Sequence, residues 1–289
     1  MQGALLMSNK ITFGYIVGGE DKHYNNLIRS LGSLERIEQP HDVVILDADS
    51  RLEADEDRPN IRIIPFPVDE AKGEGWFKPH YWQMRYHLNK YVETDHCFYM
   101  DTDTVIVNDR VDELIEEAED DFLICRHWWV PQLKDYLERV RVNIGLVSHL
   151  IEENNVEILT LLLGLFLFQK EKHDHIFDTY HKKFDSVFAS MPNNAQGITD
   201  ELLLCLTLNE TGGYRTTNGS MNHSSEQEQM PLKFNAGTFW GKNPQDELYK
   251  KVFAFHNDLL EFPTLSYFRT NFDDENFIKN FKEVCYVEE

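Results

Sequence analysis

The sequence predicts an α/β fold whose core is a parallel sheet flanked by helices. Short apolar runs at residues 11–17, 43–46 and 61–65 alternate with stretches of helical periodicity, which is the rhythm of βαβ units. Residues 97–100 are apolar at every position, which is typical of a parallel strand covered on both faces. Two of these runs, 43–46 and 97–100, end in paired aspartates. Open α/β sheets bind their ligands at the carboxyl ends of such strands.

The first half of the chain supplies most of these expected elements. Residues 22–37 follow the strand at 11–17 and carry Leu27, Ile28, Leu31 and Leu34 at helical spacing. Residues 78–91 form an expected helix rich in aromatic side chains. Residues 111–118 are expected to form a short acidic helix, and residues 122–125 another strand.

The second half continues the alternation less regularly. Helices are expected within residues 128–157, 173–190 and 273–284, and from Thr199, a candidate N-cap, onward. Strands are expected at residues 161–168, 233–240 and 252–255. Residues 209–231 are rich in Asn, Ser, Gly and Gln, which predicts a mobile loop. No internal repeat and no clear linker divides the chain, so we expect one domain over residues 1–289.

The charge of the chain excludes some classes of partner. Acidic residues outnumber basic ones by 50 to 28, which gives a formal net charge of −22. Nucleic acids and anionic membranes both require basic patches, so neither is an expected partner. A nucleotide diphosphate remains compatible if a local cation offsets the field.

The cysteines and apolar runs indicate a cytoplasmic protein. The four cysteines are widely separated and form no C-x-x-C pair, so a zinc site is not expected and a reducing compartment fits. The first ten residues lack the positive region of a signal peptide. The longest apolar run, residues 158–168, is too short to span a bilayer, so no membrane anchor is expected.

Asp101 and Asp103 are the strongest candidates for a metal site. Two carboxylates at the end of a buried strand repel each other and lose hydration, and a divalent cation relieves both effects. Asp47 and Asp49 repeat the pattern after another strand, so position alone does not choose between the pairs. Context favours Asp101 and Asp103, because a lysine-bearing aromatic helix precedes them and a second β-branched run follows.

The segment Phe-Tyr-Met-Asp-Thr-Asp-Thr-Val-Ile-Val at residues 98–107 resembles the D-x-D segment of GT-A fold glycosyltransferases. It is most similar to the retaining family 8, the glycogenin and galactinol-synthase type, and further weak motifs follow in the family's order over residues 11–260. The resemblance implies a mixed, mainly parallel sheet flanked by helices. It also implies a nucleotide-binding half at 11–125, an acceptor and sugar half at 126–262, and a helical tail at 263–289.

The same resemblance implies a set of site residues. Asp101, Asp103 and His256 are expected to hold Mn²⁺, with Mg²⁺ as the alternative, since imidazole favours the later metals. Lys78 is expected to face the donor. Asp200 is expected to hold the donor sugar or to stabilise positive charge at the anomeric carbon.

Three further residues are expected in the nucleotide site. Tyr24 matches a tyrosine beside the nucleotide base, with a core aromatic as the alternative. Asp47 ends the second strand and is expected near the ribose or base, with a solvated loop carboxylate as the alternative. Thr102 lies between the two metal-binding aspartates.

Two departures from the family pattern stand out. Leu162 and Leu163 precede Gly164, where the family has Asn and a small residue. After His256 the family's diphosphate-binding lysine is absent, so Lys242, Lys233 or Arg85 is expected to supply that charge.

We therefore expect a metal-dependent transferase that moves a hexose from UDP-glucose or UDP-galactose with retention of configuration. The expected acceptor is a glycan, a protein tyrosine or a small polyol. Two alternatives stay open: a nucleotidyltransferase or sugar-nucleotide hydrolase on a similar sheet, and a nucleotide-sugar-binding module with little turnover.

Overall fold

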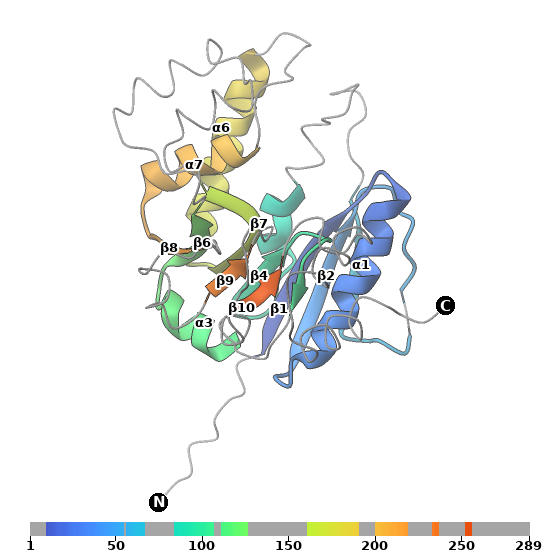
Figure 1. The fold of residues 1–289 in the computed structure, drawn as a ribbon. Coiled ribbons are helices and arrows are strands. Elements are labelled where there is room, and N and C mark those ends of the chain that lie inside the picture. The colour runs from blue at the N-terminus through green and yellow to red at the C-terminus, as the bar shows by residue number, and fades with distance from the viewer. Residues whose placement is uncertain are drawn as a thin grey trace, which may run out of the picture.

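The computed structural model describes residues 10–54, 56–66, 84–106, 111–126, 161–190, 200–218, 233–236 and 252–255. A seven-stranded sheet in the order β3-β2-β1-β4-β7-β6-β8 forms its centre (Figure 1). In chain order its strands are β1 (Ile11–Val17), β2 (His41–Asp47), β3 (Ile61–Pro65), β4 (His96–Met100), β6 (Phe122–Arg126), β7 (Leu161–Gln169) and β8 (Tyr214–Asn218).

The sheet is mixed and mainly parallel, as the sequence predicts. β1 pairs in parallel with β2 and β4, β2 with β3, and β6 with β8. β7 runs antiparallel to both β4 and β6. The carboxyl ends of β1, β2 and β4 consequently meet at one edge of the sheet, which we call the carboxyl edge.

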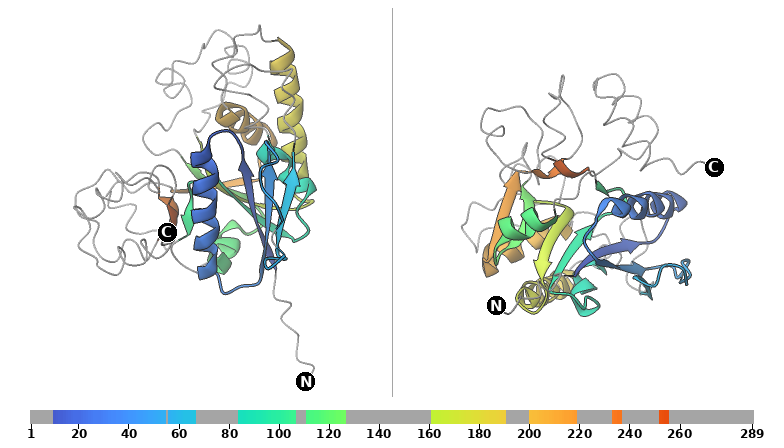
Figure 2. Two further views of the ribbon diagram at one scale, coloured as in Figure 1. Left: turned by 90° about the vertical axis from the view of Figure 1, so that its right-hand side faces the viewer. Right: turned by 90° about the horizontal axis from the view of Figure 1, so that it is seen from below.

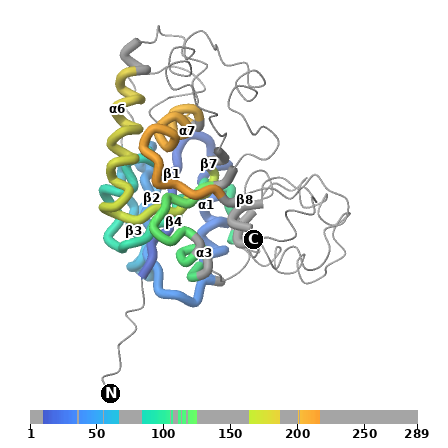
Figure 3. Tube along the Cα trace, turned by 90° about the vertical axis from the view of Figure 1, so that its left-hand side faces the viewer, coloured from blue at the N-terminus to red at the C-terminus, as the bar shows by residue number. Residues whose placement is uncertain are grey.

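Helices cover both faces of the sheet (Figures 2 and 3). α1 (Asp21–Ser33), the short 3₁₀-helix η1 (Leu34–Arg36) and α3 (Val111–Ala118) contribute to one buried cluster. The 3₁₀-helix η3 (Met84–Lys90), α6 (Asp174–Ser190) and α7 (Asp200–Thr211) contribute to the other. β7 shows the division, because Phe166 and Phe168 belong to the second cluster and Leu165 and Leu167 to the first.

A second, three-stranded sheet lies between α1 and α3 in Figure 1. It has the order β5-β10-β9 and contains β5 (Val105–Ile106), β9 (Lys233–Ala236) and β10 (Val252–Phe255). Phe255, at the end of β10, pairs with Val105, which lies two residues beyond Asp103. A late part of the chain is thereby brought to the segment that follows the D-x-D motif.

The prediction of a loop over residues 209–231 is wrong at its start. α7 continues to Thr211, and residues 214–218 form β8, which pairs with β6. Gly212 and Gly213, with φ of +66° and +67°, end the helix in the left-handed region that glycine adopts readily. The polar composition concealed the strand, although Thr216 and Thr217 are β-branched and suit an edge position.

The remaining expected elements agree with the structure where it describes them. Within the expected helix at 78–91, residues 84–90 form the tight 3₁₀-helix η3. The helices expected within 128–157 and 273–284, and Thr199, lie outside the described residues. Among the residues that are described, no helix combines the length and apolarity needed to cross a membrane.

Candidate active site

The Asp101–Thr104 turn follows β4 directly at the carboxyl edge. The Asp101 N–H donates to the Gly164 carbonyl at 2.9 Å, and the Thr104 N–H donates to the Asp101 carbonyl at 3.0 Å, which closes the turn. The Tyr99 hydroxyl donates to Asp101 Oδ1. These bonds fix both the backbone and the carboxylate of Asp101.

Two buried serines of α1 hold the chain just beyond this turn. The Ser30 hydroxyl donates to the Thr104 carbonyl, and the Ile106 N–H donates to Ser33 Oγ at 3.0 Å. The Tyr15 hydroxyl lies 3.0 Å from Ser30 Oγ, and both serines are fully buried. α1 and the D-x-D turn are therefore joined by side-chain hydrogen bonds in the protein interior.

Arg85 joins the turn to the start of α7. Its Nη1 lies 3.5 Å from Asp101 Oδ1, and its Nε lies 3.3 Å from Asp200 Oδ2. The side chain of Arg85 is only 3% exposed, against 22% for Asp101 and 15% for Asp200. One largely buried guanidinium thus contacts two carboxylates from separate elements.

The surroundings of Arg85 keep it charged. Burial alone would lower the pKa of its guanidinium. The neighbouring Tyr99, Asp200 and Asp101 outweigh that effect and raise this pKa well above its ordinary value. The guanidinium carbon also lies 4.9 Å from the centre of the Tyr99 ring, within cation–π range.

Close packing of η3 explains why Arg85 stands at this place. A Cβ added at Gly14 of β1 would lie 3.0 Å from Leu88 Cδ1 and 3.2 Å from Cys97 Sγ, so the lack of a side chain at Gly14 lets Leu88 of η3 pack closely against the sheet. On the other side, the rings of Tyr86 and Tyr180 stack with centroids 3.5 Å apart. η3 is held between β1 and α6, and Arg85 is directed toward the end of β4.

A second polar cluster occupies the ends of β1 and β2. The Tyr24 hydroxyl donates to Asp47 Oδ1 at 2.8 Å, and Asp49 Oδ2 lies 3.4 Å from the same hydroxyl. The backbone N–H groups of Asp49 and Leu52 donate to the Asp47 carboxylate at 3.2 and 2.7 Å. Burial, followed by the hydrogen bond to Asp47, raises the pKa of Tyr24, so its hydroxyl stays protonated and remains a donor.

The structure gathers the predicted site residues that it describes into these two clusters. Asp101, Asp103 and Thr102 share one turn with Arg85 and Asp200 beside it, while Tyr24 and Asp47 lie together at the neighbouring strand ends. Lys78 and His256 lie outside the described residues, as do the side chain of Lys233 and all of Lys242.

The burial of Asp47 settles one of the open alternatives. Asp47 is fully buried, so the interpretation as a solvated loop carboxylate is wrong for this residue. Three protein donors bind its carboxylate, which gives Asp47 a structural task at the end of β2.

The D-x-D turn offers suitable donors for a hard cation. Asp101 and Asp103 present two carboxylates one residue apart, and oxygen ligands of this kind suit Mg²⁺ or Mn²⁺. Within the described part of the chain, no group of three or more His, Cys, Asp or Glu side chains could complete such a site. The expected third ligand, His256, falls outside that part.

Sequence reasoning missed the residues that orient the predicted ones. Tyr99 is two positions before Asp101, and the period of two along a strand places both on one side. That signal was available. The roles of Ser30 and Ser33 could not be predicted from the local sequence, because their partners Thr104 and Ile106 are more than 70 residues away.

Known proteins match this chain in fold rather than in sequence. No family model matches it, and no curated protein matches it. A structure of an active-site mutant of LgtC gives a TM-score of 0.55 at 16% identity, covering 97% of this chain and 98% of LgtC. The galactosyltransferase LgtC in complex with donor and acceptor sugar analogues gives 0.54 at 15% identity over the same shares.

Two further glycosyltransferases show the same likeness over part of their length. The bifunctional glycosyltransferase WbbM gives a TM-score of 0.54 at 13% identity, covering 99% of this chain and 51% of WbbM. The glycosyltransferase GlyE of Streptococcus pneumoniae TIGR4 gives 0.51 at 11% identity, covering 97% of this chain and 60% of GlyE. At these identities the likeness shows the fold, and this chain has the GT-A fold of these glycosyltransferases.

Proposed function

We propose that this protein is a metal-dependent glycosyltransferase of the retaining family 8 type, which moves a hexose from a UDP-sugar to a sugar acceptor. The observation that carries the proposal is the contact of the buried Arg85 with the partly exposed Asp101 and Asp200 at the carboxyl edge of a GT-A fold. The likeness to LgtC, which was solved with donor and acceptor sugar analogues, supports a sugar as the acceptor.

Asp101 and Asp103 are the proposed metal ligands, with His256 as the third. The pairing of Phe255 with Val105 supports this choice, because His256 directly follows Phe255 in the sequence. A divalent cation bound there would supply Lewis-acid stabilisation of the departing diphosphate. Tyr99 holds Asp101 Oδ1, and so orients this carboxylate before any ligand arrives.

Asp200 is the proposed contact of the donor sugar. Glycosyl transfer with retention passes through an oxocarbenium-like state, and a nearby carboxylate stabilises its positive charge. Arg85 contacts both Asp200 and Asp101, so its charge is already balanced by the protein. We therefore assign Arg85 to orienting these carboxylates. Lys78, Lys233 and Lys242 remain the candidates for contacting the diphosphate.

Proton transfer needs no additional protein base in this scheme. In front-face attack, the acceptor hydroxyl approaches on the side of the leaving group, and a departing phosphate oxygen takes its proton. The task of the protein is then to hold donor and acceptor in place and to exclude water. Thr102, inside the metal-binding turn, and the cluster of Tyr24 and Asp47 belong to the nucleotide side of this site.

The test is a calorimetric and kinetic comparison on one set of variants. The wild-type protein should bind UDP-glucose or UDP-galactose in the presence of Mn²⁺ and release UDP when a sugar acceptor is added. Asp103→Asn should abolish the Mn²⁺-dependent part of donor binding, because it removes a metal-binding charge. Asp42→Asn, at the opposite edge of the sheet, is the matched control and should bind as the wild type does.

Two of the alternative functions, the binding module and the sugar-nucleotide hydrolase, have their own outcomes in this experiment. Donor binding with neither transfer nor slow hydrolysis, over a panel of sugar acceptors, would support a nucleotide-sugar-binding module. Hydrolysis that no acceptor diverts would support a sugar-nucleotide hydrolase. Equal donor affinity in Asp103→Asn and the wild type would refute the metal site.

A further inference from the structure

The buried tyrosines of this protein fall into two groups. One group places the hydroxyl at hydrogen-bond distance from another side chain, and its members are Tyr15, Tyr24 and Tyr99. Tyr86 on η3 and Tyr180 on α6 are fully buried as well. Yet neither hydroxyl makes a well-directed hydrogen bond within the part of the chain that the structure describes.

Packing alone does not account for the hydroxyls of Tyr86 and Tyr180. The two rings stack with centroids 3.5 Å apart and planes inclined by 23°. Phenylalanine at both positions would fill the same space with the same stack. A hydroxyl that leaves water without gaining a hydrogen bond is unfavourable for folding. Two such donors side by side call for a partner that the folding of the chain does not itself supply.

The junction between η3 and α6 is held without these hydroxyls. The His181 Nε2–H donates to the Tyr86 carbonyl at 3.0 Å, and the rings of His87 and His181 stack with centroids 4.2 Å apart. Two neighbouring ring stacks and a backbone hydrogen bond therefore join the two helices. Removal of either hydroxyl should leave this junction in place.

Asp200 is a carboxylate whose charge reaches both hydroxyls. Burial raises the pKa of Tyr86 and of Tyr180 well above the ordinary value, and the charge of Asp200 acts in the same direction on each. Both phenols therefore stay protonated and remain hydrogen-bond donors. Asp200 Oδ2 also lies 3.3 Å from Nε of Arg85, the residue directly before Tyr86. A carboxylate accepts several hydrogen bonds at once, so this contact does not exclude a phenol donor.

We propose that Tyr86 and Tyr180 are positioning residues for Asp200, and that their hydroxyls donate to its carboxylate when the donor sugar is bound. This inference rests on the proposed function, in which Asp200 contacts that sugar. Hydrogen bonds of catalytic groups are often long or poorly aligned without substrate and tighten in the complex. On β4, Tyr99 shows the completed arrangement, because its hydroxyl already donates to Asp101. The pair holds Asp200 where it stabilises positive charge at the anomeric carbon.

Thermal unfolding without ligand tests whether the hydroxyls serve the fold. Tyr86→Phe and Tyr180→Phe each remove a buried hydroxyl that has no well-directed bond, so the Tm of each variant should equal or exceed that of the wild type. Tyr15→Phe is the comparison, since the Tyr15 hydroxyl lies 3.0 Å from Ser30 Oγ. Its Tm should fall by about 2–4 °C.

The kinetic constants of the same variants test the positioning role. Tyr86→Phe and Tyr180→Phe should each lower kcat for UDP release from UDP-glucose or UDP-galactose on the order of tenfold, the effect of one lost hydrogen bond to a charged group. The KM for the UDP-sugar should change by less than about twofold, because the metal and nucleotide contacts are untouched. Tyr91→Phe is the matched control, a half-buried tyrosine just beyond η3, and should leave both constants unchanged.

A double-mutant cycle shows whether the tyrosines act through Asp200. Tyr86→Phe should have little further effect on kcat in the Asp200→Ala background, because the carboxylate that its hydroxyl binds is gone. Tyr180→Phe should behave in the same way. An undiminished fall in kcat in that background would mean that the hydroxyls act elsewhere, and would overturn the proposal.

The outcomes separate this inference from the proposed function. If the wild type turns over a UDP-sugar and both phenylalanine variants match its kcat, the positioning role is refuted while the transferase proposal stands. If the variants lose Tm but keep kcat, the hydroxyls serve the fold, and the positioning role is likewise refuted. If the wild type neither transfers from nor hydrolyses any UDP-sugar tested, the proposed function fails, and the positioning role fails with it.

Discussion

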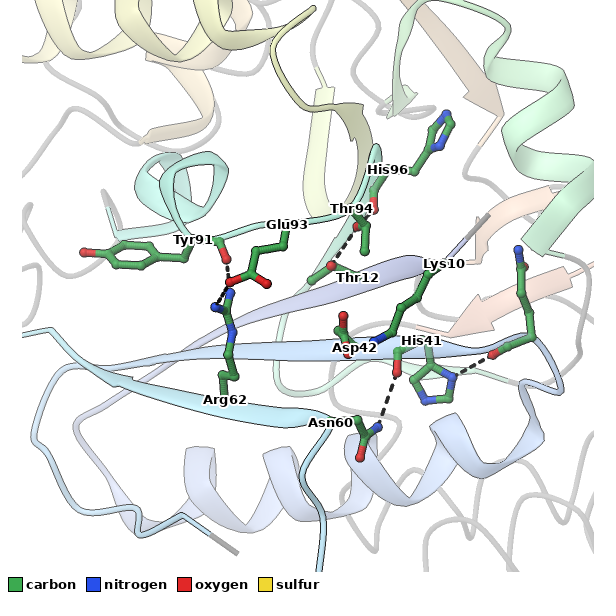
Figure 4. Close-up of polar contacts among 11 residues, drawn as sticks. Lys10, Thr12, His41, Asp42, Asn60, Arg62, Tyr91, Glu93, Thr94 and His96 are labelled. Carbon is green, nitrogen blue, oxygen red and sulfur yellow. Dashed lines mark hydrogen bonds and ion pairs between the residues drawn. The ribbon is translucent and has the colours of Figure 1, made fainter. Parts of the chain in front are cut away.

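The two edges of the central sheet use the same kinds of residue in opposite ways. At the amino edge, where β1 to β4 begin, Lys10 pairs with Asp42 at 2.6 Å and Arg62 pairs with Glu93 (Figure 4). The side chains of Lys10 and Glu93 are 51% and 72% exposed. At the carboxyl edge, Arg85 is 3% exposed and contacts two carboxylates at once.

Water decides how much each of these contacts contributes. An exposed ion pair is screened and loses side-chain entropy, so it contributes little to folding. A buried charge depends on its partners, because it has given up its hydration. Removal of a charge should therefore lower the free energy of unfolding only slightly at the amino edge, and much more at the carboxyl edge. Because Arg85 and its two carboxylates depend on one another, their geometry is fixed, which suits this cluster to binding a charged donor.

The largest expected effect comes from removing the buried cation. Arg85→Met should lower the free energy of unfolding by about 3–5 kcal/mol, because it leaves Asp101 and Asp200 partly buried without their shared partner. Urea unfolding followed by circular dichroism measures the loss. Arg62→Met at the amino edge is the matched control, with an expected loss of about 1 kcal/mol or less. Equal losses in the two variants would contradict the distinction between the edges.

The double variant Arg85→Met, Asp200→Leu tests whether the stability lost in Arg85→Met comes from carboxylates left without a partner. Asp200→Leu removes one of the two carboxylates that lose their partner when Arg85 is replaced. The double variant should recover part of the stability that Arg85→Met loses, since residues in one charge network do not contribute additively. A double variant less stable than the sum of both single changes would argue against the ion pair.

A smaller effect is expected from the second cluster of the carboxyl edge. Tyr24→Phe removes one of the donors to the buried Asp47 carboxylate and should cost about 1–2 kcal/mol. The two backbone donors from Asp49 and Leu52 limit the loss. Thr12→Val, which removes the 2.8 Å hydrogen bond to Thr94 at the amino edge, is the comparison and should cost less. Urea unfolding measures both.

The sequence predicted which residues lie at the carboxyl edge, but it did not predict the contacts between them. The apolar run at 97–100 and the two pairs of aspartates placed Asp47 and Asp101 at strand ends, which the structure confirms. Arg85 was considered only as a cation for the diphosphate. Its bonds to Asp101 and Asp200 depend on packing at Gly14 and Tyr180, and no local pattern contains that information.

The second half of the sheet was predicted less well for a related reason. Among the described strands β8 lies at the sheet edge beside β6, and its residues Tyr214, Arg215 and Thr216 are half-buried. Its sequence therefore lacks the apolar run that marks β1 or β4. Composition is informative where a segment must be buried on both faces. It carries little information about an edge strand, whose position depends on the neighbour with which it pairs.

Protonation of the buried His173 should make the amino edge sensitive to acid. Burial lowers the pKa of His173 to about 4 from an ordinary 6.5, although the hydrogen bond to the Asp120 carbonyl opposes this shift. Because the unfolded state binds the proton more tightly, the stabilisation is complete above pH 6.5 and is lost as the pH falls toward 4. We expect a loss of about 1 kcal/mol by pH 5, after allowing for residual solvation.

Urea unfolding at intervals between pH 7 and pH 4.5 measures this slope. His173→Gln should flatten it, since the titrating ring is gone. His175→Gln, two residues along and exposed, is the matched control and should leave the slope as in the wild type. An unchanged slope in His173→Gln would assign the acid sensitivity to other groups. The first candidate is His87, whose pKa burial also lowers to about 4, followed by His96, whose pKa burial lowers as well.

The smallest effect is expected from the exposed pair of Lys10 and Asp42. Lys10→Met should change the free energy of unfolding by about 0.5 kcal/mol or less, because the pair lies in water where attraction and side-chain entropy nearly cancel. That small difference should fade further in 0.5 M salt, where the screening length falls below about 5 Å. The loss in Arg85→Met should persist in the same salt, because mobile ions do not reach a guanidinium that is 3% exposed. Urea unfolding of both variants at low and high salt therefore separates the two edges by their screening as well as by their size. If the stability loss in Arg85→Met also decreased at high salt, water would reach the Arg85 guanidinium.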